Sequence, residues 1–319
     1  MQQIVGRHLA SSCDEVATDR LGNVVGLRRA SDRRDGAPRL VIAAHSDEIG
    51  LMVRHIDDRG YLRVALVGGI HAHTSTSQRV VVHGREDVKG VIVPVHPVHG
   101  KPEALTPEDL FIDLGLPVER VRELVEVGDA VSYAQEFEQL NDKVVLGRNF
   151  DDRIGTYCLV QAMREVGETQ VDVYAASTVQ EELGVRGAEV VGNVTSPDIA
   201  VAIDGSLPRG PYVDEHVWTT EFGAGTGIYV MDSRTLGSPK LVAFLVELCR
   251  RRDIPFQRNV GGGTDASALQ RSGAGALATT IGAPVRYMHS TVQLCHEDDI
   301  DATVALLVAL MESAHELLA

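Results

Sequence analysis

Two adjacent glutamates, Glu181 and Glu182, follow an apolar run that predicts a buried strand over residues 171–176. Adjacent carboxylates at the end of a strand repel each other and are costly to desolvate. A pair of metal ions supplies the positive charge that would hold them there. One glutamate could bind metal while its neighbour, kept off the metal, acts as a general base. A lone glutamate pair is more often simply solvated, so the prediction depends on what stands at other strand ends.

Two further segments carry metal-binding side chains after a predicted strand or at the start of a predicted helix. His45 follows an apolar strand predicted over residues 39–44. Asp47, two residues later, can accept the second ring N–H of His45 and so fix its tautomer. Asp151 and Asp152 open a predicted helix, where an aspartate caps the backbone amides. Because capping needs only one of them, one of this pair could bridge two ions.

The last two candidates are Asp204, directly after a strand predicted over residues 198–203 and apolar from residue 199 on, and His289 in the segment RYMHS. A charged residue that ends a buried strand of an open α/β sheet belongs to the crevice where ligands bind. The full set contains imidazoles and carboxylates but no thiolate, which suits Zn²⁺, Co²⁺ or Mn²⁺ and disfavours Ca²⁺. Two ions about 3.5–4 Å apart need one bridging carboxylate, and each ion needs one histidine and one further carboxylate. Five ligands satisfy that count and leave Glu181 as the spare carboxylate.

Composition limits the class of protein and its partners. The chain has 319 residues, more than one hydrophobic core usually organises, so a large domain plus a smaller one is predicted. Its hydrophobic content of 44% is ordinary for a soluble globular protein. The formal net charge of −15 argues against nucleic acid or an anionic membrane as a partner. Divalent cations would offset part of that charge.

The cysteines and the N-terminal sequence predict a cytoplasmic protein. Cys13, Cys158, Cys249 and Cys295 show neither a C-x-x-C spacing nor the density of a disulfide framework, so they are predicted to be reduced. The sequence starts with MQQIVGRH, which has no apolar signal-peptide core. No segment is apolar over the length of a membrane span, so no membrane partner is expected.

Apolar strands alternate with amphipathic helices at both ends of the chain. Helices are predicted over residues 153–165 and 238–251, and from 298 to the C-terminus. Continuous apolar strands separated by helices indicate a sheet that is covered on both faces, hence an α/β layered domain. We predict that this domain is discontinuous and comprises residues 1–60 and 144–319.

The middle of the chain, residues 61–143, has a different pattern. Short alternating strands such as residues 78–83 and 90–93 are separated by turn residues, with little helix beyond a turn near residues 107–110. This pattern predicts a small β-rich domain inserted into the α/β domain.

Two other motifs were weighed as binding sites. The segment GGGTDAS at residues 261–267 lacks the lysine and the spacing of a phosphate-binding loop, so a glycine-rich turn before a helix is the safer interpretation. Four histidines of the insert are further candidates: His71, His73, His96 and His99. The segment PVHPVH at residues 94–99 resembles a ligand cluster, but a polar loop is the safer interpretation. A histidine that reaches into the site of a neighbouring subunit is a further hypothesis.

These motifs resemble those of a known family. The strings AHSDEIGLMV, GRNFDDRIG, STVQEELGVRGA, AIDGS, GGGTDAS and RYMHS occur in the order typical of metallopeptidase family forty-two, the glutamyl or tetrahedral (TET) aminopeptidases. The resemblance extends from about residue 19 to the C-terminus. It implies an α/β/α peptidase domain with an inserted, barrel-like dimerisation domain, peptides as substrates, two divalent metal ions per subunit, and assembly into dimers or tetrahedral dodecamers.

The resemblance also implies a role for each site residue. Asp151 would bridge the two metals through a segment in which the Asp151–Asp152 peptide is cis. His45 and Asp204 would complete the coordination of one metal, and Glu182 and His289 would complete that of the other. A water that bridges the metals would lose its proton to Glu181, attack the first peptide carbonyl, and leave Glu181 to protonate the departing amine. Asp47 would orient His45. Thr264 and Asp265, in the glycine-rich segment, would lie near the substrate.

Three departures from the family pattern concern assembly and specificity more than catalysis. The helix expected before the first strand is short. His289 is followed by STVQ, where SPVE is commoner. Asp204 is followed by Gly205 and Ser206 instead of a bulkier pair.

Two other functions remain as alternatives. An endoglucanase-type glycosidase could use paired carboxylates, but the chain has 4% aromatic residues and a single tryptophan, Trp218, with which to stack on sugars. A non-catalytic shell protein of the same fold would be expected to lose Glu181 or a metal ligand, and the sequence retains all of them. The preferred N-terminal residue, the native metal and the assembly do not follow from the sequence.

Overall fold

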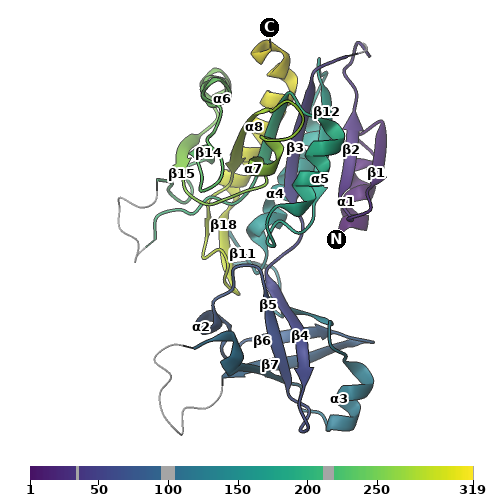
Figure 1. Ribbon diagram of the computed structural model, residues 1–319. Helices are drawn as coiled ribbons and strands as arrows, with labels where there is room; N and C mark the ends of the chain where they lie inside the picture. Colours follow the sequence, from purple (N-terminus) through teal and green to yellow (C-terminus); the bar gives the residue numbers. More distant parts are fainter. Residues whose placement is uncertain (34–35, 95–104, 211–218, 319) are drawn as a thin grey trace.

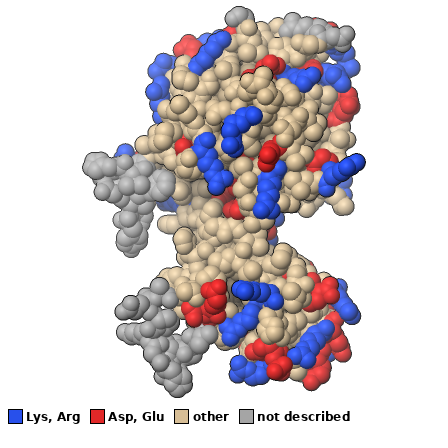
Figure 2. Space-filling view, in the orientation of Figure 1, with Lys and Arg blue, Asp and Glu red and all other residues tan. Residues whose placement is uncertain are grey.

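The computed structural model describes residues 1–33, 36–94, 105–210 and 219–318. It contains an α/β domain built on an eight-stranded sheet and, below it in Figure 1, a small closed β-barrel. Basic and acidic side chains are interspersed on both domains on the face shown in Figure 2. No helix among the described residues is both long and apolar enough to cross a membrane.

The eight-stranded sheet has parallel strands at its centre. Its order is β1 (Glu15–Thr18), β2 (Val24–Arg28), β12 (Asp172–Thr178), β3 (Arg39–His45), β13 (Ile199–Ile203), β16 (Leu277–Gly282), β14 (Thr226–Met231) and β15 (Phe256–Val260). The strands β12, β3, β13 and β16 are mutually parallel. Their carboxyl ends therefore meet at one edge of the sheet. Thr178 pairs with His45, and Ile203 pairs with Ala44, so the residues that follow β12 and β13 emerge level with His45.

Helices cover both faces of this sheet, as the apolar strands predict (Figure 1). On one face pack α1 (Gln2–Leu9), α4 (Phe150–Glu165), α6 (Pro239–Arg252) and α8 (Glu297–Ser313), which continues into the 3-10 helix η3 (Ala314–Leu317). On the other face pack α5 (Arg186–Thr195) and α7 (Ala266–Leu269). Alternate residues of β3 serve the two cores: Leu40 and Ile42 face the first group, and Val41 and Ala43 the second.

Six antiparallel strands close the barrel. Their order is β4 (Gly50–Ile56), β5 (Leu62–Val67), β8 (Leu110–Asp113), β7 (Asp87–Pro94), β6 (Arg79–His83) and β9 (Ala130–Tyr133). The barrel has its own apolar core, with fully buried Leu62, Val80, Ile92 and Ile112. Short helices α2 (Ala72–Ser75) and η2 (Pro107–Asp109) connect its strands.

The barrel differs from the sequence-based prediction in two respects. A two-turn helix, α3 (Val118–Leu124), was not predicted; its Val121 is fully buried against the barrel core. The strand β4 already belongs to the barrel although it precedes the predicted boundary between residues 60 and 61. We therefore propose that the inserted domain comprises residues 50–133.

A second, four-stranded sheet lies beside the start of α4. It contains β10 (Glu138–Gln139), β11 (Val144–Gly147), β18 (Gln293–His296) and β17 (Val285–Arg286). Because β11 leads into α4 and β17 and β18 flank the segment with His289, this sheet holds two distant parts of the chain together. Gly147 pairs with Gln293 in it.

The remaining local predictions agree with the structure to within a few residues, and α4 starts at Phe150, before the predicted residue 153. The short N-terminal helix is α1, eight residues long. All four cysteines are free thiols, and Cys158, Cys249 and Cys295 are buried.

Candidate active site

The carboxyl edge of the parallel strands gathers the candidate ligands. His45 is the last residue of β3, Glu181 and Glu182 follow β12, and Asp204 follows β13. Asp151 comes from the first turn of α4, and His289 from the segment between β17 and β18. The structure thus brings together all five predicted ligands and the spare glutamate from five separate segments.

The ligand atoms form two clusters that share Asp151. In one cluster His45, Asp151 and Asp204 each present an atom within 4.8 Å of the others, and in the second Asp151, Glu182 and His289 do the same. The Nε2 atom of His45 lies 3.1 Å from Oδ1 of Asp151, and the Nε2 atom of His289 lies 3.3 Å from Oδ2 of the same carboxylate. Each oxygen of Asp151 therefore serves one histidine, as a carboxylate that bridges two ions would.

The backbone at Asp151 is fixed by its neighbours. The Asp151–Asp152 peptide is cis, as the resemblance implies, and both residues have non-helical dihedral angles although they lie within α4. The amide of Asp151 donates to the side-chain oxygen of Gln293 at 2.9 Å. Gln293 was noted only as a departure from the family pattern; the structure shows that its amide oxygen accepts this bond. A Cβ at residue 155 would collide with the carboxylate of Asp152, so Gly155 is required there.

Asp47 contacts more groups than the sequence predicts. Its Oδ1 lies 3.6 Å from Nδ1 of His45, while the carbonyl oxygen of Asp47 is slightly nearer, at 3.3 Å. Its two carboxylate oxygens accept the amides of Glu181 and Glu182, each at 3.2 Å. The carboxylate of Asp47 therefore positions the backbone of the glutamate pair, while the hydrogen-bond partner of the His45 ring is the Asp47 carbonyl oxygen.

Burial and mutual repulsion make Glu181, Glu182 and Asp204 weak acids. Burial, followed by the negative charges of neighbouring carboxylates, raises the pKa of Glu181 to about 8 and the pKa of Glu182 to about 7. Burial and the charge of Asp151 also raise the pKa of Asp204. The Oε1 atom of Glu182 is buried without a hydrogen-bond partner among the described residues. An unpaired buried oxygen within a group of like charges is what divalent cations would stabilise, so these residues fit a metal site.

A group of ion pairs outside the two ligand clusters stabilises the start of α4. Glu48 is flanked by Arg148 at 3.1 Å and Arg153 at 3.0 Å, and all three side chains are largely buried. Arg148 also donates to the carbonyl oxygen of Gln135, at the end of the barrel segment. These residues were not predicted, because no pattern in the sequence indicates that they meet.

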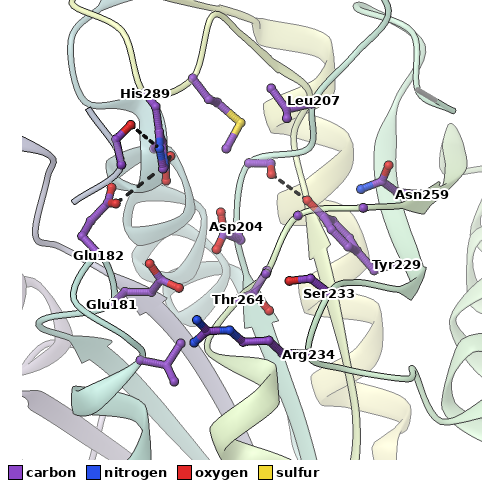
Figure 3. Close-up of a pocket in the computed structure, with 18 of the residues that line it drawn as sticks. Glu181, Glu182, Asp204, Leu207, Tyr229, Ser233, Arg234, Asn259, Thr264 and His289 are labelled. Atoms are coloured by element: carbon purple, nitrogen blue, oxygen red, sulfur yellow. Dashed lines mark hydrogen bonds and ion pairs between the residues drawn. The ribbon is translucent and has the colours of Figure 1, made fainter. Parts of the chain in front are cut away.

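The clusters open into a cavity of about 550 Å³ (Figure 3). Its wall includes Thr264, which is expected near the substrate, and also Leu207, Tyr229 and Arg234, which no sequence motif indicated. Asp265 lies behind the wall: it is buried and accepts a hydrogen bond from the Thr178 hydroxyl at 2.5 Å.

Of the histidines in the insert, His71 lines the cavity and His73 is exposed. His96 and His99 lie outside the described residues. His71 reaches this cavity from its own chain, so its presence there does not test the hypothesis of a histidine donated by a neighbouring subunit.

Two imidazole–carboxylate clusters that share one aspartate are the arrangement expected of a hydrolase that uses two metal ions. The chain belongs to the M42 glutamyl aminopeptidase family, whose model matches residues 22–306. It is therefore a peptide-bond hydrolase.

Individual relatives support the same assignment. A lysyl aminopeptidase of Pyrococcus furiosus is 34% identical over 315 residues, which cover 95% of this chain and 88% of that protein. The structure of aminopeptidase APDkam598 from Desulfurococcus kamchatkensis has a TM-score of 0.92 at 36% identity and covers 98% of this chain and 88% of its own. The TET1 peptidase of Pyrococcus horikoshii, described as assembling into a tetrahedron or a large octahedral shell, has a TM-score of 0.86 at 31% identity, with coverage of 97% and 92%.

Proposed function

We propose that this enzyme removes the N-terminal residue of peptides with two divalent ions, one held by His45, Asp151 and Asp204 and the other by Asp151, Glu182 and His289. The observation that carries the proposal is the sharing of Asp151 by both clusters. Glu181 belongs to neither cluster but lines the same cavity. It is therefore free to exchange protons with groups bound there.

The side chains of this protein would then divide the reaction as follows. When bound, the ions supply Lewis acidity that polarises the scissile carbonyl and acidifies the attacking water. Glu181 accepts the proton of that water on a carboxylate oxygen and delivers it to the departing amine nitrogen. Asp47 keeps Glu181 and Glu182 in place through their amides. Thr264 lines the wall near the substrate.

Aminopeptidase action requires a free N-terminal amine. We expect peptides with a free N-terminus to be cleaved one residue at a time and their N-acetylated counterparts to resist. The measurement is a panel of aminoacyl-p-nitroanilides and of matched free and acetylated peptides, assayed after metal removal and separate addition of Zn²⁺, Co²⁺ and Mn²⁺. Equal cleavage of acetylated and free peptides would contradict the proposal. The same panel identifies the preferred N-terminal residue and the metal.

Metal removal should destabilise the protein more at alkaline than at acidic pH. Without metal, the pKa values of Glu181 (about 8) and Glu182 (about 7) exceed the ordinary 4.5. A raised carboxyl pKa contributes stability that is complete below the unfolded value and is lost as the pH rises through the folded value. The chelated protein should therefore lose stability between about pH 5 and pH 8, whereas bound cations balance the same charges.

Differential scanning fluorimetry with and without a chelator tests this expectation. The difference in Tm between metal-loaded and chelated protein should widen by several degrees, on the order of 5 °C, as the pH rises across this range. A difference that stays constant or narrows would show that the two glutamates do not balance bound cations.

Self-association follows from the likeness to assembled relatives. We propose that the chain forms a dimer through its barrel domain and a larger tetrahedral assembly of twelve subunits, since TET1 peptidase structures are described as a dodecamer and as a tetrahedron. The free, mostly buried cysteines support the proposed cytoplasmic location.

Neither alternative function gains support from the site. Tyr229 is the one aromatic side chain among the described residues that line the cavity, and its hydroxyl donates to the carbonyl oxygen of Gly205; Trp218 lies outside the described residues. A glycosidase site would have no evident use for His45 and His289. A non-catalytic shell protein would have no need to keep Glu181 in the cavity.

A further inference from the structure

The cavity has two chemically different ends on opposite sides of Asp204. In Figure 3, Leu207 lies above Asp204 and Arg234 lies below it. Met288 lines the cavity beside Gly205, because a Cβ on Gly205 would lie 3.0 Å from its sulfur. Leu207 and Met288 supply apolar side chains, and Figure 3 also places the polar side chains of His289 and Asn259 above Asp204. Arg234 is the only lysine or arginine among the described residues that line the cavity, so the lower end carries the fixed positive charge.

The guanidinium of Arg234 is available to a ligand. The side chain is exposed, and none of the ion pairs found among the described residues includes Arg234. Figure 3 shows that it extends toward the side of the cavity where Glu181 lies. An arginine that points into a cavity without a partner presents a planar set of donors suited to a carboxylate.

Hydrogen bonds hold the backbone at Arg234 in place, so the point from which its side chain extends is fixed. The buried carboxylate of Asp232 accepts the amides of Arg234 at 2.7 Å and Thr235 at 2.6 Å. The amide of Ser233 donates to the carbonyl oxygen of Gly262 at 3.0 Å, which ties this turn to the glycine-rich wall. A side chain whose backbone is already held in place loses less conformational entropy when it binds a ligand.

The direction of the substrate follows from the proposed proton transfer, on which this inference rests. Glu181 protonates the departing amine, so the leaving peptide must lie on the side of Glu181, and Arg234 points to that side. The N-terminal side chain then faces the end of the cavity where Leu207 lies. We propose that Arg234 binds a carboxylate of the leaving peptide, either the C-terminal carboxylate of a dipeptide or an acidic side chain on the residue after the cleaved bond.

Substrates that differ only in that carboxylate test the proposal. With the N-terminal residue X chosen as the best from the p-nitroanilide panel, the peptides are X-Ala, X-Ala-amide and X-Asp-amide. Comparing X-Ala with X-Ala-amide isolates the C-terminal carboxylate, and comparing X-Asp-amide with X-Ala-amide isolates the side chain. A charge-assisted hydrogen bond of the usual strength predicts a preference of about tenfold for the peptide with the carboxylate in at least one comparison, expressed mainly in KM.

Variants of Arg234 decide whether this residue causes the preference. R234Q should reduce the ratio of kcat/KM values to about one, R234E should invert it, and R234K should retain part of it because the charge remains. The matched control is R250Q, which alters an exposed arginine of α6 outside the cavity and should keep the wild-type ratio.

Either of two results overturns the inference: no preference in the wild-type enzyme, or a preference that survives in R234Q and R234E. Because each ratio compares two peptides on one variant, a general loss of folding changes both rates and leaves the ratio intact. Failure of the proposed aminopeptidase function is distinguishable, since wild-type protein would then leave the whole p-nitroanilide panel uncleaved.

Discussion

Replacing Glu181 by glutamine is expected to lower kcat by about 10²–10⁴-fold while two metal ions stay bound. Glutamine keeps the shape of the side chain but cannot accept the proton of the attacking water. Glu181 is absent from both ligand clusters, so metal content should not change. The measurements are kcat on the best p-nitroanilide and the metal-to-protein ratio by elemental analysis.

The control for this prediction is E189Q, which makes the same change at an exposed glutamate on α5, close in sequence to Glu181. It should retain wild-type kcat and metal content. An E181Q enzyme with normal turnover would remove Glu181 from the proton-transfer role. An E181Q enzyme that lost one ion would instead make Glu181 a ligand.

Replacing Asp151 by asparagine should weaken both metal sites at once. Its two oxygens face His45 and His289 separately, so loss of its charge removes an anionic ligand from each ion. Metal-assisted polarisation contributes several kcal/mol to such reactions, so activity should fall by at least about a hundredfold. Elemental analysis should find well under two ions per subunit.

The comparison variant is D204N, which alters a residue of only one cluster. It should leave about one ion per subunit bound, since the second cluster is untouched. Circular dichroism confirms that both variants are folded. If D151N and D204N lost the same single ion, Asp151 would not bridge the two sites.

Several parts of the site could be predicted from local sequence patterns. His45 and Asp204 each follow a continuous apolar strand, and parallel strands covered on both faces must place such residues at one edge. The register of β3 with β12 and β13 satisfies this expectation. The residue types also limit the choice of metal. A set of imidazoles and carboxylates without a thiolate suits Zn²⁺, Co²⁺ or Mn²⁺ and disfavours Ca²⁺.

Other features depend on contacts between distant segments. Gln293 accepts the amide of Asp151 across 142 residues, and no local pattern marks that glutamine as part of the site. Glu48 meets Arg148 and Arg153 only because the start of α4 packs against the end of β3. The helix α3 was missed because its seven residues are too short for a clear periodicity. The barrel was predicted to start at residue 61, although β4 already belongs to it. The reason is that β4 follows the segment after His45 without a break in the sequence pattern.

By itself the sequence determined the class of chemistry, since the identity of the ligands, their positions after apolar strands and the spare Glu181 are local properties. Only the tertiary structure decided how the ligands divide between two clusters that share Asp151, because that division depends on distances between five segments. It also decided that Arg234, which no motif marks, faces the side of the cavity where Glu181 lies. A charge acquires a role in binding only when folding fixes its distance and direction from the reacting atoms.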